Sequence, residues 1–129
     1  MMTVTLNDEK TIRAAYQCWP DGDRTGLEKL IAEGFHFTSP LDNRLDRRTF
    51  FTRCWPNSAN IAAIDIKHLL PQENRAFVVY ELRMKDGRRF RNAELVMIEG
   101  GKIADIEVYF GWNLPHDAPS GGFVDQQKR

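Results

Sequence analysis

The sequence predicts an α+β fold, and three observations lead to it. Residues 7–19 and 25–31 carry apolar side chains at helical spacing, and a third helical pattern runs from 46 to 55. From residue 61 onward, four segments alternate apolar and polar residues and are separated by turn sequences. Helices and strands are therefore segregated along the chain, which is typical of α+β rather than alternating α/β folds.

Composition and charge describe an ordinary globular domain. The 129 residues are 42% hydrophobic and 28% charged, and the formal net charge is zero. This balance gives no support for a nucleic-acid partner. No apolar run approaches the roughly 18 residues of a membrane span, and the N-terminus does not resemble a signal peptide. We expect a single domain over residues 1–129, cytoplasmic, with no nucleic-acid and no membrane partner.

The first helix is expected to begin at Asn7, because asparagine is a preferred capping residue. Ile12, Tyr16 and Trp19 recur at spacings of four and three, so they share one helical face. The run Pro20-Asp21-Gly22-Asp23 is expected to end this helix.

A short second helix follows, with Thr25 and Glu28 as a capping box and Gly34 as its end. Residues 35–39 alternate in the manner of a strand, and Pro40 is expected to end it. The polar run from 41 to 45 is predicted to be a loop.

The third helix is expected to start at Asp46 and to end before a turn at residues 56–58. Residues 61–70 form the next predicted strand, in which a bulge would change the side to which His68 points. A turn at 71–74 leads to a strand at 76–84, and Lys85-Asp86-Gly87 is a hairpin signal.

The last strand pair, from Phe90 to Trp112, carries the strongest functional signal. Its two arms join at Gly100-Gly101-Lys102. Strand alternation places Glu94 on an apolar face, and a lone acid in such a place is a candidate working residue. The alternative is a structural carboxylate bonded to Tyr16, Tyr80 or a tryptophan indole, and both interpretations stay open. The inward-facing residues would be Phe90, Asn92, Glu94, Val96 and Ile98 on one arm, and Ala104, Ile106, Val108, Phe110 and Trp112 on the other.

The opposite face of the predicted sheet is apolar as well. A sheet that is apolar on both faces needs a cover on each side, and the helices supply only one. A second copy of the chain is the simplest other cover, so we predict a homodimer. The outer-face residues are Phe77, Val79, Leu95, Met97 and Tyr109.

Metal and cofactor chemistry lack sequence support. The three histidines have no ligand spacing, and no phosphate-binding or dinucleotide-binding motif is present. Cys18 and Cys54 each precede Trp-Pro, which indicates two similar helix ends rather than a disulfide. We expect no cofactor and no metal.

Taken together, the ordered motifs resemble the nuclear transport factor 2-like superfamily, and within it the SnoaL-like polyketide-cyclase domain family. The likeness covers nearly the whole chain, although residues 114–129 are expected to form an irregular tail. It implies a curved mixed or antiparallel sheet wrapped around three N-terminal helices, forming a cone with an internal cavity. The segments that carry it are Tyr16 to Asp23, Leu27 to Leu30, Phe35 to Pro40, Gly101 to Ile103 and Tyr109 to Trp112.

Within that superfamily, the ketosteroid-isomerase branch implies roles for particular positions. Glu94 corresponds to an acid that binds an oxyanion, and Tyr16 lies close to the place of the oxyanion tyrosine. Ser39 stands where that branch has its base, so proton abstraction of that kind lacks its base here. Asp42 is a weaker candidate for a replacement base, since a role in a turn explains it better.

Two functions remain open from the sequence. One is a cofactor-free isomerase, cyclase or dehydratase that acts on an apolar, carbonyl-bearing substrate. The other is a non-catalytic module of the same fold that binds a small apolar ligand or another protein. In either case Glu94, Tyr16 and Asp42 are the candidate chemical groups, and the expected pocket lining is Trp19, Phe37, Ser39, Trp55, Tyr80, Asn92, Ile106, Val108, Phe110 and Trp112.

Overall fold

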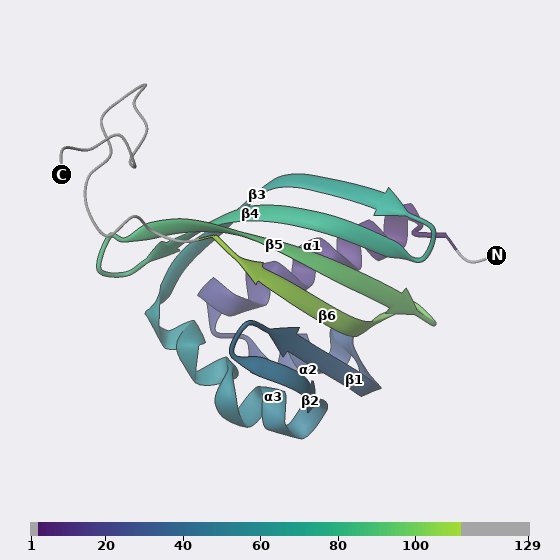
Figure 1. Ribbon diagram of the computed structural model, residues 1–129, viewed down its shortest axis with the longest axis horizontal. Coiled ribbons are helices and arrows are strands. Elements are labelled where there is room, and N and C mark those ends of the chain that lie inside the picture. The colour runs from purple at the N-terminus through teal and green to yellow at the C-terminus, as the bar shows by residue number, and fades with distance from the viewer. Residues whose placement is uncertain (1–2, 112–129) are drawn as a thin grey trace, which may run out of the picture.

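The computed structural model describes residues 3–111, which form three α-helices, a short 3-10 helix and one six-stranded sheet (Figure 1). The predicted α+β class is confirmed. Along the chain the elements are α1 (Leu6–Asp21), α2 (Arg24–Leu30), β1 (Ile31–Ser39), β2 (Asp42–Asp46), α3 (Arg47–Arg53), η1 (Trp55–Asn60), β3 (Ile61–Gln72), β4 (Arg75–Met84), β5 (Arg89–Glu99) and β6 (Lys102–Phe110).

The sheet has the order β2-β1-β6-β5-β4-β3. Strands β3 to β6 form the predicted antiparallel meander. Strand β1 joins β6 in parallel, with Phe37 opposite Ile106, and this single parallel pair makes the sheet mixed. The sheet is curved, and α1 packs against one of its faces (Figure 1). The core between them includes Ile12, Phe35, Phe50, Val78 and Val96, each almost fully buried.

The helix starts differ from the predictions, because side chains just upstream make the capping hydrogen bonds. Thr5, not Asn7, caps α1, and its side chain and that of Asp8 form a reciprocal capping box. Asp23, not Thr25, caps α2. The predicted cap of α3, Asp46, is confirmed by its side chain accepting from the Thr49 N–H at 2.8 Å.

Two predictions around the first strand are wrong. Gly34 does not end a helix; it lies inside β1, which begins directly after Leu30. The run predicted as a loop contains the edge strand β2, joined to β1 by the two residues Pro40 and Leu41. The two errors have different causes. Ile31, which fits the helical pattern, instead pairs with Ile103 of β6 and is buried there, and the polar edge strand β2 has no apolar face that a sequence pattern could reveal.

Bulges set which side chains face inward. In β3 the register shifts between Ile66 and His68, and His68 is exposed. In β6 the register shifts opposite Met97 and Ile98, so that Ile103 is buried in place of the predicted Ala104. The alternation predicted for β5 is confirmed, with Asn92, Glu94, Val96 and Ile98 all buried.

Among the described residues, no helix is both long enough and apolar enough to span a membrane.

Candidate functional site

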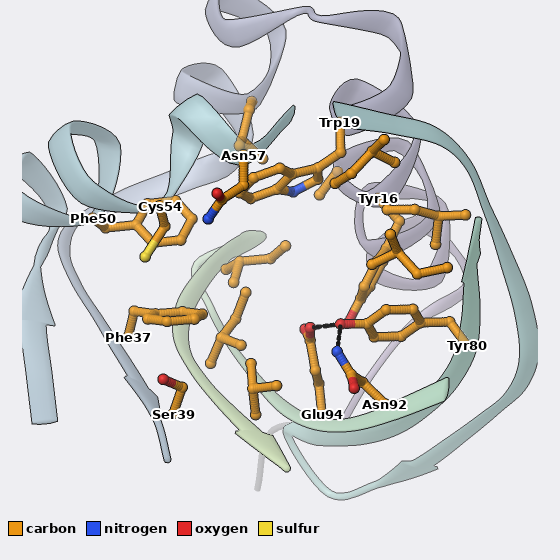
Figure 2. Close-up of a pocket in the computed structure, with 18 of the residues that line it drawn as sticks. Tyr16, Trp19, Phe37, Ser39, Phe50, Cys54, Asn57, Tyr80, Asn92 and Glu94 are labelled. Atoms are coloured by element: carbon orange, nitrogen blue, oxygen red, sulfur yellow. Dashed lines mark hydrogen bonds between the residues drawn. The ribbon is translucent and has the colours of Figure 1, made fainter. Parts of the chain in front are cut away.

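A cavity of about 210 Å³ lies between the sheet, α1 and the segment that contains α3 and η1 (Figure 2). Its wall is largely apolar and comes from nearly every element. The lining residues are Ala15, Tyr16, Trp19, Leu27, Ile31, Phe37, Ser39, Leu41, Asp42, Phe50, Cys54, Asn57, Ile61, Ile64, Tyr80, Leu82, Asn92, Glu94, Ile103, Ile106, Val108 and Phe110.

Most residues that the sequence nominated lie in this wall. All three candidate chemical groups line the cavity, and so do eight of the ten nominated lining residues: Trp19, Phe37, Ser39, Tyr80, Asn92, Ile106, Val108 and Phe110. Trp55 is not in the lining. Its ring packs on Trp19 and Phe51, with centroid distances of 4.9 Å and 6.4 Å. Trp112 lies outside the described residues, as does the predicted tail at 114–129.

Glu94 is the buried polar centre of the cavity. It points inward from the middle of β5, and the residue is only 7% exposed. The Tyr16 hydroxyl donates to its Oε1 at 2.5 Å, and the Tyr80 hydroxyl donates to its Oε2 at 2.5 Å (Figure 2). The tyrosines come from α1 and β4, so three separate elements meet at this carboxyl group.

A further chain of hydrogen bonds fixes the direction of the Tyr80 contact. The backbone N–H of Gly111 donates to Asn92 Oδ1 at 3.0 Å, and Asn92 Nδ2 donates to the Tyr80 hydroxyl at 3.2 Å. The Tyr80 oxygen therefore acts as an acceptor toward Asn92 and uses its own proton on Glu94. A protonated Glu94 would keep its own O–H for another partner, because both tyrosines already act as donors.

Burial dominates the ionisation of this cluster. Removal from water raises the pKa of Glu94, and the hydrogen bonds from Tyr16 and Tyr80 lower it again in part. Burial, followed by the nearby Glu94 charge, raises the pKa of each tyrosine well above its ordinary value of 10.0. Both phenols are therefore neutral donors at physiological pH. The cavity consequently holds an acid that favours its neutral form more than an exposed glutamate does.

A second polar group lies across β6 from Glu94. The Ser39 hydroxyl donates to Asp42 Oδ2 at 3.3 Å and accepts from the Leu41 N–H at 3.1 Å. Arg53 Nη2 lies 3.1 Å from Asp42 Oδ1 but is not aligned for a hydrogen bond, so this buried oxygen has no hydrogen-bond partner within residues 3–111. Asp42 thus begins a strand and also contributes a carboxylate to the cavity wall.

Sequence reasoning missed several lining residues. Cys54 and Asn57 come from the end of α3 and from η1, and no local pattern marks either as inward-facing. Burial raises the pKa of the Cys54 thiol to about 11, so it is a weak nucleophile at neutral pH. Phe50 was recognisable as apolar on its helix, but only tertiary packing shows that it faces the cavity. Its ring lies 5.0 Å from that of Phe37.

No group of three or more His, Cys, Asp or Glu side chains is placed to hold a metal ion in the part of the chain that the structure describes. The cavity residues themselves can hydrogen-bond and transfer a proton at Glu94, and can hydrogen-bond at Ser39 and Asp42.

Comparison with solved structures identifies the fold. A crystal structure from Kribbella flavida DSM 17836, named as a proposed ketosteroid isomerase, matches with a TM-score of 0.73 and 17% identity over 100% of this chain and 93% of that chain. A nuclear transport factor 2-like protein of unknown function from Burkholderia pseudomallei matches with a TM-score of 0.67 and 17% identity, over 82% and 92% of the two chains. TerC, co-crystallised with polyporic acid, matches with a TM-score of 0.68 and 14% identity, over 81% and 91%. At such low identities these likenesses show the fold alone.

No curated protein has a sequence that matches this chain. The family model of the SnoaL-like domain matches residues 12–106, which span α1 to the middle of β6 and include Tyr16, Asp42, Tyr80 and Glu94. With this match over most of its length, and with the cone-like α+β fold of the nuclear transport factor 2-like proteins, the chain belongs to the SnoaL-like domain family.

Proposed function

We propose that the protein is a cofactor-free enzyme that binds a small, apolar, carbonyl-bearing molecule in this cavity and catalyses its isomerisation, cyclisation or dehydration. The observation that carries the proposal is the buried Glu94 carboxyl group, which faces an apolar cavity and is held by two tyrosine hydroxyls at 2.5 Å each. A buried acid with a raised pKa that faces a cavity is a candidate functional group.

The proposed step is proton transfer at a substrate carbonyl. Neutral Glu94 donates a hydrogen bond to the carbonyl oxygen, and Tyr16 and Tyr80 hold the carboxyl group in position. As a proton leaves the neighbouring carbon, the proton of Glu94 moves to the oxygen and yields the enol. Water takes the carbon-bound proton. Asp42, the weaker candidate base, lies three strands from Glu94 in the sheet, and its two oxygens face Arg53 and Ser39.

The size of the cavity favours a compact ligand. Its volume of about 210 Å³ is below the range of roughly 300–1,000 Å³ that is typical of drug-sized sites. A substrate of two fused rings therefore suits the space better than a larger one, unless part of the molecule projects out of the cavity.

A specific observation also supports a second candidate, a non-catalytic binding module. Glu94, Tyr16, Tyr80 and Asn92 satisfy one another, and Ser39 stands where the ketosteroid-isomerase resemblance implies a base. A binder with this cavity would hold an apolar ligand and orient it through Glu94 without converting it.

The two candidates are separated by a thermal-shift screen of wild type and Glu94→Gln against steroid, polyketide and terpenoid ketones, with mass spectrometry of every compound that stabilises the protein. We expect at least one compound to stabilise both proteins and to be converted by wild type alone. Stabilisation of both proteins without conversion would support the binding module and contradict the enzyme. If no compound stabilised either protein, both candidates would lose their basis.

We further propose that the outer face of the sheet forms a homodimer interface. Phe77 and Tyr109 are 46% and 54% exposed, and Val79, Leu95 and Met97 lie half-buried beside them. Register places Phe77 opposite Leu95, and places Val79 and Tyr109 on either side of Ala93, so the residues form adjoining rows across three strands. Large exposed apolar side chains in neighbouring rows favour association with another apolar surface.

A further inference from the structure

The cavity has two polar ends that lie in one row across the sheet. Thr38 is paired with Glu107 in the parallel β1–β6 register, so the next residue, Ser39, falls beside Val108. Val108 is paired with Glu94, and Ser39 is paired with Asp42 on the other side. The row therefore reads Asp42, Ser39, Val108, Glu94 from the edge of the sheet toward its middle.

The positions in this row give the distance between the two polar ends of the cavity. Neighbouring strands lie about 4.8 Å apart, and two such spacings separate Ser39 from Glu94. Because the sheet is curved, the backbones of these two residues are about 10 Å apart at most. Val108 lies between them and supplies an apolar floor. In Figure 2, Ser39 and Glu94 project from separate strands with aliphatic side chains between them. A ligand of two fused rings is long enough to reach from one end to the other.

The edge end of the row, formed by Ser39 and Asp42 with Arg53 of α3 beside it, has unused capacity to accept hydrogen bonds. The Ser39 hydroxyl donates to Asp42 and accepts from the Leu41 N–H, which leaves its oxygen one further lone pair. Asp42 is a carboxylate whose side chain is only 12% exposed, and its Oδ1 has no hydrogen-bond partner among residues 3–111. A poorly satisfied, largely buried carboxylate gains when a ligand supplies a donor.

The side chain nearest this oxygen, that of Arg53, is solvent-exposed. Arg53 Nη2 lies 3.1 Å from Oδ1, but the Arg53 side chain is 59% exposed and makes no aligned hydrogen bond there. Because the Arg53 end of this pair is solvent-exposed, water can hydrate the guanidinium group when the side chain is displaced. The carboxylate can then turn toward a ligand donor while it keeps the nearby positive charge.

From these observations we propose that Ser39, Asp42 and Arg53 form a second polar subsite, which binds a hydroxyl group at the far end of a ligand whose other oxygen lies at Glu94. The preferred ligand class is thus a compact, flat, apolar molecule with an oxygen function at each end. This inference rests on the proposed binding of a small molecule in the cavity. It adds that the edge of the sheet recognises a hydroxyl group at the far end of that molecule.

The test uses two probes, 2-naphthol and 2,6-naphthalenediol, which share a ring system and differ in the distal hydroxyl. Affinities are measured by isothermal titration calorimetry for wild type, Asp42→Asn, Ser39→Ala and the control Asp65→Asn, which changes an exposed carboxylate paired with Lys67. We expect wild type and Asp65→Asn to prefer the diol by about tenfold, the effect of one hydrogen bond to a charged group. In Asp42→Asn and Ser39→Ala the preference should fall to about twofold or less, with the 2-naphthol affinity unchanged.

Circular dichroism of each variant shows whether it is folded. If either Asp42→Asn or Ser39→Ala fails to fold, the other substitution still tests the subsite. Equal binding of both probes by wild type would overturn the second subsite and leave the small-molecule cavity intact. If both Asp42→Asn and Ser39→Ala still preferred 2,6-naphthalenediol over 2-naphthol, the second subsite would likewise be overturned. If wild type bound neither probe and Glu94→Gln changed nothing in the ketone screen, the subsite and the proposed function would fail together.

Discussion

At the scale of single residues, the account depends on one buried carboxyl group and the tyrosines that hold it. Glu94 is recognisable from strand alternation alone, because it is the charged residue on an otherwise apolar or neutral face. The partners of Glu94 could be named only as alternatives, since Tyr16 lies 78 residues away in the chain and its contact depends on how α1 packs on the sheet. In the structure both tyrosines, rather than one, donate to the carboxyl group.

The raised pKa of Glu94 has a consequence for stability. A group that binds its proton more tightly in the folded state stabilises the fold fully below its unfolded pKa, which lies near 4.5, and this contribution is lost as pH rises through the folded pKa. Wild type should therefore lose stability relative to Glu94→Gln as pH rises above about 4.5, by about 1.4 kcal/mol per unit of pKa difference. Urea unfolding of both proteins from about pH 4 to about pH 8 measures this difference, and a pH-independent difference would contradict a buried acid whose pKa is raised.

At the scale of elements, the site depends on where β6 ends. Gly111 follows β6 directly and orients Asn92, and through it Tyr80. A Cβ atom at Gly111 would lie 1.8 Å from the carbonyl oxygen of Arg91, whereas one at Gly34 would meet no atom within 4 Å. The same substitution should therefore have opposite consequences at the two positions.

Gly111→Ala is expected to lower the free energy of unfolding by about 1–3 kcal/mol, because the backbone must move away from β5 to remove the clash. Gly34→Ala should be neutral or should stabilise by up to about 1 kcal/mol, since it restricts the unfolded chain without a clash. Chemical denaturation of both variants measures the two effects. Equal stability of Gly111→Ala and Gly34→Ala would show that Gly111 does not lie as close to the Arg91 carbonyl as the structure has it.

Sequence patterns predicted the elements well where a single apolar face marks them, and less well elsewhere. The alternation of β4 and β5 and the hairpin at Gly100 and Gly101 are local signals, and the structure has both. Strand β2 carries no such signal, because an edge strand with polar residues reads as a loop. The bulge that buries Ile103 instead of Ala104 arises from pairing between strands, which no local pattern encodes.

At the scale of the whole molecule, helices cover one face of the sheet, and no element within residues 3–111 covers the other face. We propose that this outer face associates with a second copy through Phe77 and its neighbours. Leu6, at the start of α1, offers a matched control, since it is 77% exposed but belongs to another element.

Sedimentation velocity is expected to give wild type about twice the chain mass of 14.9 kDa. Phe77→Glu should sediment as a monomer, because a charge placed in the centre of the interface would lose its hydration on association. Leu6→Glu should remain a dimer. A wild type that stays monomeric across the concentration range, or a dimer that persists in Phe77→Glu, would contradict an interface on the outer face.

The central claim is that Glu94 transfers a proton to a ketone held in the cavity. The most direct measurement is the rate at which deuterium from solvent enters the carbon positions beside the carbonyl of β-tetralone, a two-ring ketone, followed by NMR in D₂O with wild type, Glu94→Gln and Asp65→Asn. We expect wild type and Asp65→Asn to accelerate the exchange, and Glu94→Gln to lose about 10²–10⁴-fold of that acceleration, the usual contribution of a positioned acid or base. Exchange at the same rate in wild type and Glu94→Gln, or no acceleration by wild type, would contradict the claim.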